Sequence, residues 1–205
     1  VFVSYSPVYM HETSIMANIP EMLHRFNPVA FQSVPAVLEV FQHKIEATVN
    51  SKSPAERNRF DAMLKTSFAI RKRTGVNVGK KLFKPIRDKV FGTNLQILVV
   101  GSTLLKQSVY DFYYALGVDE IRNVYCSTEA PLPFLQTTPS DGYMGSSVGK
   151  LEGSAPFGAQ VKIQDVDIDG MGEICIKSPY LFTSYFRNPE LTRHAFDREG
   201  FFRTG

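Results

Sequence analysis

The sequence is poor in the residues that build disulfide frameworks, metal sites and membrane spans. Its 205 residues include only two cysteines, Cys126 and Cys175, and no C-x-x-C pair, which excludes a disulfide framework and disfavours a zinc site. The four histidines are scattered without metal-ligand spacing. No apolar run approaches the roughly 18 residues that a membrane-spanning helix needs. A reducing compartment is the default expectation.

Both ends of the sequence read as cut from a longer protein. It opens on V-F-V-S-Y-S, without the Met start and basic flank of a signal peptide, and closes on F-F-R-T-G in mid-pattern. The composition, 43% hydrophobic and 21% charged, is ordinary for a globular protein. We therefore expect one large domain or a piece of a bigger one.

Positive charge is concentrated in one segment. Residues 52–89 hold 12 of the 23 Lys and Arg but only 3 of the 20 acids, so the segment carries +9 and the rest of the chain −6. Such a stretch suits an anionic membrane surface or nucleic acid, and a solvated helical face is equally compatible. We expect no nucleic-acid partner and a peripheral membrane contact, on the cytoplasmic side of the endoplasmic reticulum or another organelle.

Apolar runs alternate with helical patterns along the first 131 residues. Helical spacing of apolar residues predicts helices over 55–73, 80–91 and 106–117. Alternating strands and helices favour an α/β domain with a largely parallel sheet. The predicted strands cover residues 1–6, 29–34, 95–100 and 120–125.

After residue 131 the composition changes to Gly, Ser and Pro, which is typical of a loop. Two β-like runs follow, at 159–168 and 172–178, and their period-2 alternation predicts a hairpin with one buried face. A short helix is expected to begin at Asn188-Pro189. The expected division is therefore an α/β portion over 1–131, with a basic helical insertion at about 50–91, and a loop and β-rich portion over 132–205.

Small and hydroxyl residues follow two neighbouring predicted strands. Gly101-Ser102-Thr103 comes after L-Q-I-L-V-V, and Tyr125-Cys126-Ser127-Thr128-Glu129 ends the next strand. Ligands of open α/β sheets bind beyond the carboxyl ends of the strands. Glycine permits close backbone approach, hydroxyls and backbone amides hold phosphate oxygens, a tyrosine ring offers a stacking face, and a carboxylate near phosphates holds Mg²⁺. These residues alone fit a nucleotide pocket and a Ser/Thr turn with a solvated Glu equally well.

The order of motifs favours the first interpretation. V-Y-C-S-T-E, then G-E-I-C-I-K-S-P with N-P-E-L-T, then G-F-F-R-T-G resembles the adenylate-forming (AMP-binding) family of acyl-CoA synthetases, which shows Y-G-x-T-E, G-E-(I/L)-x-(I/V)-x-G-P, N-P-x-x-T and G-(W/F)-x-R-T-G-D. P-V-A-F-Q-S-V-P and L-V-V-G-S-T-L-L are similar to its P-T-x-x-x-x-V-P and G-G-A-P-L segments. The basic stretch at 50–91 is most similar to the long-chain fatty-acid branch.

The resemblance implies a role for each residue of these strand ends. Tyr125 would lie against adenine, Thr128 would hold the α-phosphate, and Glu129 would bind Mg²⁺, so Thr128 and Glu129 are the expected catalytic residues. Ser102 and Thr103 would line the other side of the adenine. The expected nucleotide-binding residues are Gly101, Ser102, Thr103, Asn123, Val124, Tyr125, Cys126, Ser127 and Thr128. His11 is a further pocket candidate, and a structural histidine is equally compatible.

The resemblance also implies a reaction with ATP, Mg²⁺ and CoA. A fatty acid would be converted to acyl-adenylate and pyrophosphate, and CoA would then displace AMP. The family's phosphate loop would precede residue 1, while its ribose-binding Asp and catalytic Lys would follow Gly205, so the 205 residues alone are expected to be inactive. Cys126 replaces the family's Gly, and Ser178 and Ser184 replace two further glycines. A non-catalytic nucleotide-binding relative and a sibling ligase for another carboxylate are the alternatives.

Overall fold

The computed structural model describes residues 15–131, 134–135 and 158–205. Its elements alternate as the sequence predicts, and the α/β class is confirmed. The first strand-like run, 1–6, and His11 lie outside the described residues. In chain order the elements are α1 (Ile15–Phe26), β1 (Ala30–Ser33), α2 (Pro35–Asn50), α3 (Pro54–Thr74), α4 (Gly79–Leu82), α5 (Lys84–Phe91), β2 (Ile97–Val100), α6 (Gln107–Leu116), β3 (Glu120–Tyr125), β4 (Phe134–Leu135), β5 (Gln160–Gln164), β6 (Glu173–Lys177), α7 (Pro189–His194) and β7 (Phe202–Arg203).

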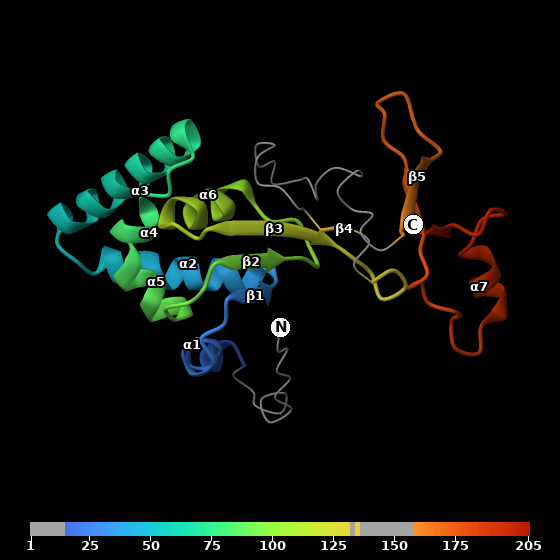
Figure 1. The fold of residues 1–205 in the computed structure, drawn as a ribbon, viewed down its shortest axis with the longest axis horizontal. Helices are drawn as coiled ribbons and strands as arrows, with labels where there is room; N and C mark the ends of the chain where they lie inside the picture. The colour runs from blue at the N-terminus through green and yellow to red at the C-terminus, as the bar shows by residue number, and fades with distance from the viewer. Residues whose placement is uncertain (1–14, 132–133, 136–157) are drawn as a thin grey trace. The chain divides into compact units, whose positions relative to one another are not determined.

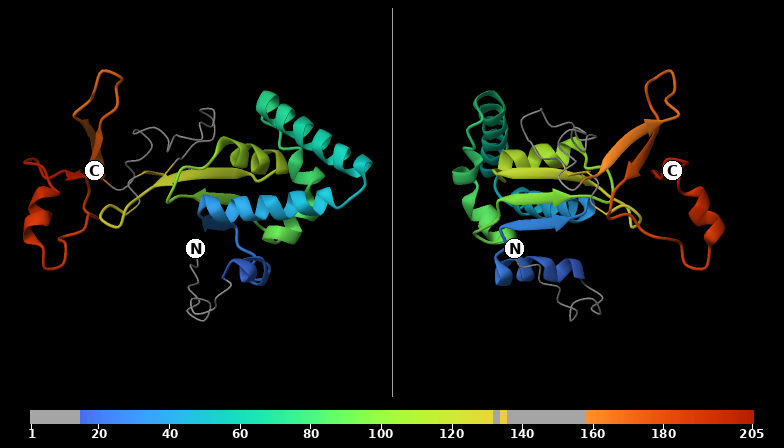
Figure 2. Two further views of the ribbon diagram at one scale, coloured as in Figure 1. Left: turned by 180° about the vertical axis from the view of Figure 1, so that it is seen from behind. Right: turned by 45° about the vertical axis from the view of Figure 1, so that its right-hand side comes forward.

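The described chain forms two compact units. One comprises residues up to Val99 together with Lys106–Ile121, and the other comprises Val100–Leu105 with Arg122–Gly205. The expected division at residue 131 stays a prediction. A four-stranded sheet has the order β1-β2-β3-β4, in which β1, β2 and β3 run in one direction and β4 is antiparallel to β3 (Figure 2).

Aromatic side chains hold the core of the first unit together. Helices α2 and α6 pack against each other, and the hydroxyl of Tyr113 in α6 donates to the carbonyl of Leu38 in α2 at 2.6 Å. Phe91 lies edge-on to both Phe41 and Tyr113, with 5.8 Å between ring centroids. Each fully buried side chain of this size contributes about 1.5–3 kcal/mol of transfer free energy. Burial also raises the pKa of Tyr113 well above its usual value.

Helix α3 begins and ends as its sequence predicts. Ser53 and Glu56 form a reciprocal capping box, and Gly75 closes the helix with a left-handed φ of 75°. The single helix expected over 80–91 is instead two, α4 and α5, separated at Phe83. Pro85 has no N–H with which to continue the first helix, so it starts a new one. The break leaves Leu82 44% exposed, while Phe83 is buried.

The basic segment is not a uniformly solvated face. Arg71 and Arg87 are buried, and Arg71 donates to the carbonyls of Tyr114, Val118 and Asp119 at 2.6–2.8 Å. It therefore fastens α3 to the end of α6, and burial lowers its pKa. In the described part of the chain no helix combines the length and apolarity needed to cross a bilayer. The peripheral membrane contact stays a prediction, testable by binding of the full-length protein to anionic vesicles.

The second unit contains the predicted hairpin. Strands β5 and β6 are antiparallel, with Val161 opposite Ile176, and β7 adds a third strand beside β6. The expectation of one buried face was incomplete, because Cys175 on the other face is fully buried as well. Lys162 and Arg203, on the flanking strands, lie opposite Cys175 in the register, and their long side chains can cover that face.

Candidate functional site

The end of β2 approaches β3 too closely for any side chain at Gly101. A Cβ atom added there would lie 2.8 Å from Val124 Cγ1 and 3.2 Å from the Val124 carbonyl oxygen. Glycine was expected at this position so that a ligand could approach, whereas the structure shows that strand β3 itself occupies the space. Gly101 and Val124 are thus brought together at the strand ends, as the sequence predicts.

Ser102 adopts a backbone conformation that usually belongs to glycine. Its φ is +81°, in the left-handed region that costs an L-residue about 1–2 kcal/mol. The family motif to which this loop is similar carries glycine here. The side chains of Ser102 and Thr103 are both exposed, so no packing offsets the strain at Ser102.

We expect Ser102→Gly to stabilise the folded chain by about 0.5 kcal/mol, because relief of left-handed strain exceeds the added flexibility of the unfolded state. The matched control is Ser108→Gly in the first turn of α6, where glycine should cost about 0.5–1 kcal/mol. Urea denaturation of the two variants should therefore show shifts of opposite sign. A loss of stability in both variants would contradict this account of Ser102.

Strand β3 carries the predicted motif to its carboxyl end. Asn123 and Val124 are buried, while Cys126 and Thr128 are exposed. Tyr125 packs partly against the small core formed by Ala130, Ile176 and Phe202. Part of the Tyr125 ring is therefore buried in this core.

Ser127 closes a tight turn directly after β3. Its backbone N–H donates to the Ala130 carbonyl at 3.2 Å, and its Oγ accepts from the Ala130 N–H at 3.1 Å. Ser127 therefore acts as a turn residue, as the interpretation of the motif as a Ser/Thr turn predicts. Four described non-glycine residues have positive φ and Cys126 is not among them, so the backbone does not demand glycine at that position.

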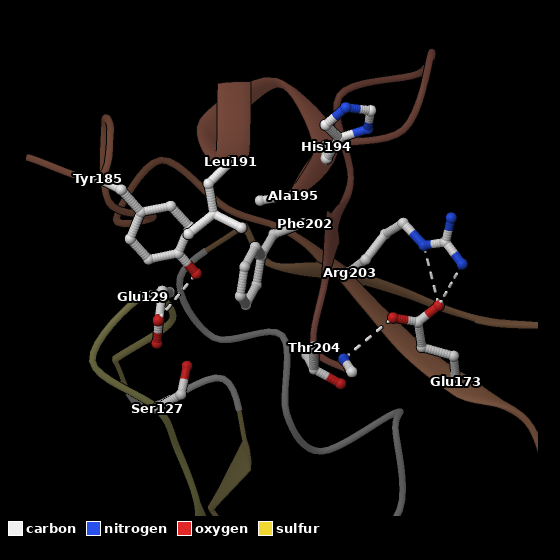
Figure 3. A pocket seen from close by; sticks show the side chains of 11 residues that line it. Ser127, Glu129, Glu173, Tyr185, Leu191, His194, Ala195, Phe202, Arg203 and Thr204 are labelled. Carbon is white, nitrogen blue, oxygen red and sulfur yellow. Dashed lines mark hydrogen bonds and ion pairs between the residues drawn. The ribbon is translucent and has the colours of Figure 1, made fainter. Parts of the chain in front are cut away.

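Glu129 is held at two points by a segment more than fifty residues further along the chain. Its Oε1 accepts a hydrogen bond from the Tyr185 hydroxyl at 3.0 Å, and its carbonyl accepts one from the Phe182 N–H at 2.8 Å. Its own backbone amide, followed by the Tyr185 hydroxyl, lowers the pKa of Glu129 against the opposing effect of burial. The carboxylate is therefore ionised at neutral pH and points into a pocket (Figure 3).

This pocket has a volume of about 390 Å³ and is lined by two motifs that are far apart in sequence. Ser127 and Glu129 form one wall (Figure 3). The rest of the lining comes from β6, the segment before α7, α7 itself and the end of the described chain, with the residues Glu173, Tyr185, Leu191, His194, Ala195, Phe202, Arg203, Thr204 and Gly205.

Glu173 organises the R-T-G end of the pocket. Its Oε2 accepts from Arg203 Nε and Nη2 at 2.9 and 2.8 Å, and its Oε1 accepts from the Gly205 N–H at 3.0 Å. The Arg203 guanidinium lowers the pKa of Glu173. The glutamate of G-E-I thus holds both the side chain of Arg203 and the backbone of Gly205 in R-T-G.

Of the predicted site residues, Ser127 and Glu129 line this pocket. Gly101, Ser102 and Thr103 lie beside β3 at the end of β2, and Tyr125, Cys126 and Thr128 flank the pocket wall along the chain without lining it. Tyr185, Glu173 and Arg203 were missed as site residues. The G-E-I and R-T-G motifs were visible in the sequence, but nothing in them indicated which pocket they would meet.

The residues present fit a magnesium ion held chiefly by a nucleotide. Among the described residues no three His, Cys, Asp or Glu side chains gather into a metal-binding group. Glu129 and Glu173 both line the pocket, and Glu173 is already paired with Arg203, which leaves Glu129 as the carboxylate without a cationic partner among the described residues there. Mg²⁺ commonly binds through one or two carboxylates together with substrate phosphates, and Glu129 satisfies that requirement.

Comparison with known proteins agrees with the motifs. Residues 4–186 match the protein family described as AMP-binding enzyme. Long-chain-fatty-acid–CoA ligase 5 of Rattus norvegicus is 25% identical over 201 residues, which are 91% of this chain and 28% of that enzyme. Malonate–CoA ligase of Arabidopsis thaliana is 30% identical over 114 residues, 54% of this chain and 18% of that enzyme.

Solved structures show the same fold. The adenylation domain of a carboxylate reductase from Mycobacterium chelonae has a TM-score of 0.55 and 25% identity, over 94% of this chain and 26% of that one. Apo MatB from Rhodopseudomonas palustris has a TM-score of 0.56 and 19% identity, over 92% of this chain and 30% of that one. The chain spans less than a third of each of these four proteins. With most of its length matched, the chain belongs to the AMP-binding enzyme family.

Proposed function

We propose that the chain is part of an ATP-dependent acid–CoA ligase that activates a long-chain fatty acid. The observation that carries the proposal is a single pocket lined both by Glu129 and by Arg203-Thr204-Gly205. It joins the strand-end motif to the R-T-G motif, and both belong to the pattern that the chain shares with adenylate-forming enzymes. Family membership supports an activity of this class.

The proposed reaction has two steps. A carboxylate oxygen of the fatty acid attacks the α-phosphorus of ATP, and the bond to pyrophosphate breaks, giving acyl-adenylate. The CoA sulfur, having lost its proton, then attacks the acyl carbon, and AMP leaves with the electron pair of the broken C–O bond. Negative charge develops on phosphoryl oxygens in the first step, so catalysis depends on positioning and electrostatic stabilisation.

The chain's own residues would supply parts of that environment. The exposed hydroxyl of Thr128 would donate to an α-phosphate oxygen, and the outer face of Tyr125 would lie against the adenine. Glu129 would hold Mg²⁺, which when bound neutralises charge on the phosphate oxygens. The backbone amides after β3 and the strand-end loop at Gly101-Ser102-Thr103 would border the nucleotide.

The long-chain substrate is supported by the extent of the matches. Long-chain ligases from Rattus norvegicus and Homo sapiens align with 91% and 87% of the chain, including the basic insertion, whereas the malonate ligase aligns with 54%. The test is AMP release by the full-length protein over a panel of carboxylates, from malonate to C18 fatty acids. We expect the highest kcat/KM with long chains, and a preference for malonate or another short acid would overturn the assignment.

A non-catalytic relative is the second candidate. It is favoured by one observation, the strained Ser102 at a position where the family motif carries glycine. A protein of this kind would bind ATP, yet release no AMP with any acid in the panel. Nucleotide binding measured alongside AMP release therefore distinguishes the two candidates.

A further inference from the structure

Neighbouring residues hold both the backbone and the ring of Tyr185. Its backbone N–H donates to Thr192 Oγ1 at 3.0 Å, and that hydroxyl donates to the Asn188 carbonyl at 2.8 Å within α7. The ring lies 4.7 Å from the ring of Phe182, centroid to centroid. Both the backbone and the ring of Tyr185 are therefore held by neighbours, which limits the directions in which its hydroxyl can point.

The tyrosine and its neighbour hold both the main chain and the side chain of Glu129. The Phe182 N–H fixes the Glu129 carbonyl at 2.8 Å, and the Tyr185 hydroxyl fixes Oε1 at 3.0 Å. Figure 3 shows this hydrogen bond at the pocket wall. The carboxylate of Glu129 also accepts from its own backbone amide and from the Ser127 side chain, so Tyr185 completes a set of donors that fixes its direction in the pocket.

A phenol suits this task for an electrostatic reason. The Tyr185 hydroxyl is an uncharged donor, and it gives its hydrogen bond to Oε1 of Glu129. A neutral donor orients a carboxylate without adding a positive charge, which would compete with a metal cation. Arg203, which also lines the pocket, is paired with Glu173 at 2.8 Å.

We propose that Tyr185 is a positioning residue for magnesium: its hydroxyl donates to Oε1 and so orients the Glu129 carboxylate, which would hold the ion that accompanies ATP. This inference rests on the proposed function, since that function places Mg²⁺ at Glu129. It assigns a role to the tyrosine of S-Y-F-R-N-P, to which sequence reasoning gave none. Partners that orient a metal ligand typically change metal affinity by about 10–100-fold when removed.

The test is Tyr185→Phe in the full-length protein, with Tyr180→Phe as the matched control. Tyr180 is 59% exposed and does not line the pocket. Calorimetric titration of Mg²⁺ into protein with a non-hydrolysable ATP analogue should give about tenfold weaker ion binding for Tyr185→Phe and no change for Tyr180→Phe. The ring is kept in both variants, so the melting temperature without ligand should stay within about 2 °C of wild type.

Unchanged Mg²⁺ affinity in a folded Tyr185→Phe protein would overturn the inference. The affinity for the ATP analogue should also be measured without metal. If Tyr185→Phe lowers that affinity as much as it lowers the affinity for the metal complex, the inference is overturned, because the tyrosine would then act on the nucleotide rather than on the ion. The proposed function fails by a different result, namely wild-type protein that releases no AMP. Since calorimetry needs no turnover, it decides the role of Tyr185 in either case.

Discussion

Glu129→Gln in the full-length protein is expected to lower the rate of acyl-adenylate formation by about 100-fold or more, while ATP binding is largely kept. Glutamine keeps the size of the side chain and can still accept from Tyr185, but it lacks the charge that holds a divalent cation. The wild-type carboxylate is ionised, because its hydrogen bonds lower its pKa. The defect should therefore follow the loss of charge rather than a change of shape. AMP release under single-turnover conditions measures it.

The matched control is Glu190→Gln. Glu190 is an exposed acid in the first turn of α7 and does not line the pocket, so its replacement should leave the adenylation rate unchanged within about twofold. A wild-type rate of adenylation in Glu129→Gln would contradict the metal-binding role of Glu129. Equal losses in both variants would point instead to a general effect of acidic charge.

Gly117→Ala is expected to destabilise the fold by about 2–5 kcal/mol. Gly117 ends α6 with a φ of +94°, and an added Cβ would lie 2.2 Å from Lys80 N and 2.3 Å from Gly79 C. Those atoms are backbone, so they cannot turn aside as a flexible side chain would. The cost combines left-handed strain, about 1–2 kcal/mol, with a collision in a packed contact between α4 and α6, which adds about 1–3 kcal/mol.

Gly75→Ala separates those two costs. Gly75 also closes a helix with a left-handed φ, +75°, but nothing lies within 4 Å of its added Cβ. Strain alone should then cost about 1 kcal/mol. The free energies of unfolding of the two variants, measured by urea denaturation, should differ by about 1–3 kcal/mol, the cost of the collision. Equal losses would show that the contact between Gly79 and Gly117 is not tightly packed in solution.

Sequence reasoning predicted the fold best where a local signal sufficed. The strand at 120–125, the helix at 106–117 and the start of α7 at Asn188-Pro189 follow from apolar spacing and capping residues. Helix α2 was missed because its sequence was used only as part of a resemblance, although Leu38, Phe41 and Ile45 show helical spacing. The break at Phe83 was not predicted, because the helix over 80–91 was inferred from apolar spacing alone and the effect of Pro85 was not considered.

The site was predicted in part for a similar reason. The strand-end motif reveals Glu129, since a carboxylate behind an apolar strand stands out in the sequence itself. Tyr185 lies 56 residues away and meets Glu129 only through the tertiary fold. The pairing of Glu173 with Arg203 spans 30 residues and likewise needs the three-stranded sheet to bring its partners together. Contacts of this range leave no periodicity in a single sequence.

The measurement that bears most directly on the proposed function is ATP–pyrophosphate exchange by the full-length protein. It isolates the first step, in which the pocket around Glu129 would act, and requires no CoA. We predict exchange that depends on both a long-chain fatty acid and Mg²⁺, and that falls by about 100-fold or more in Glu129→Gln. Folded, ATP-binding protein that gives no exchange with any carboxylate would contradict the proposal.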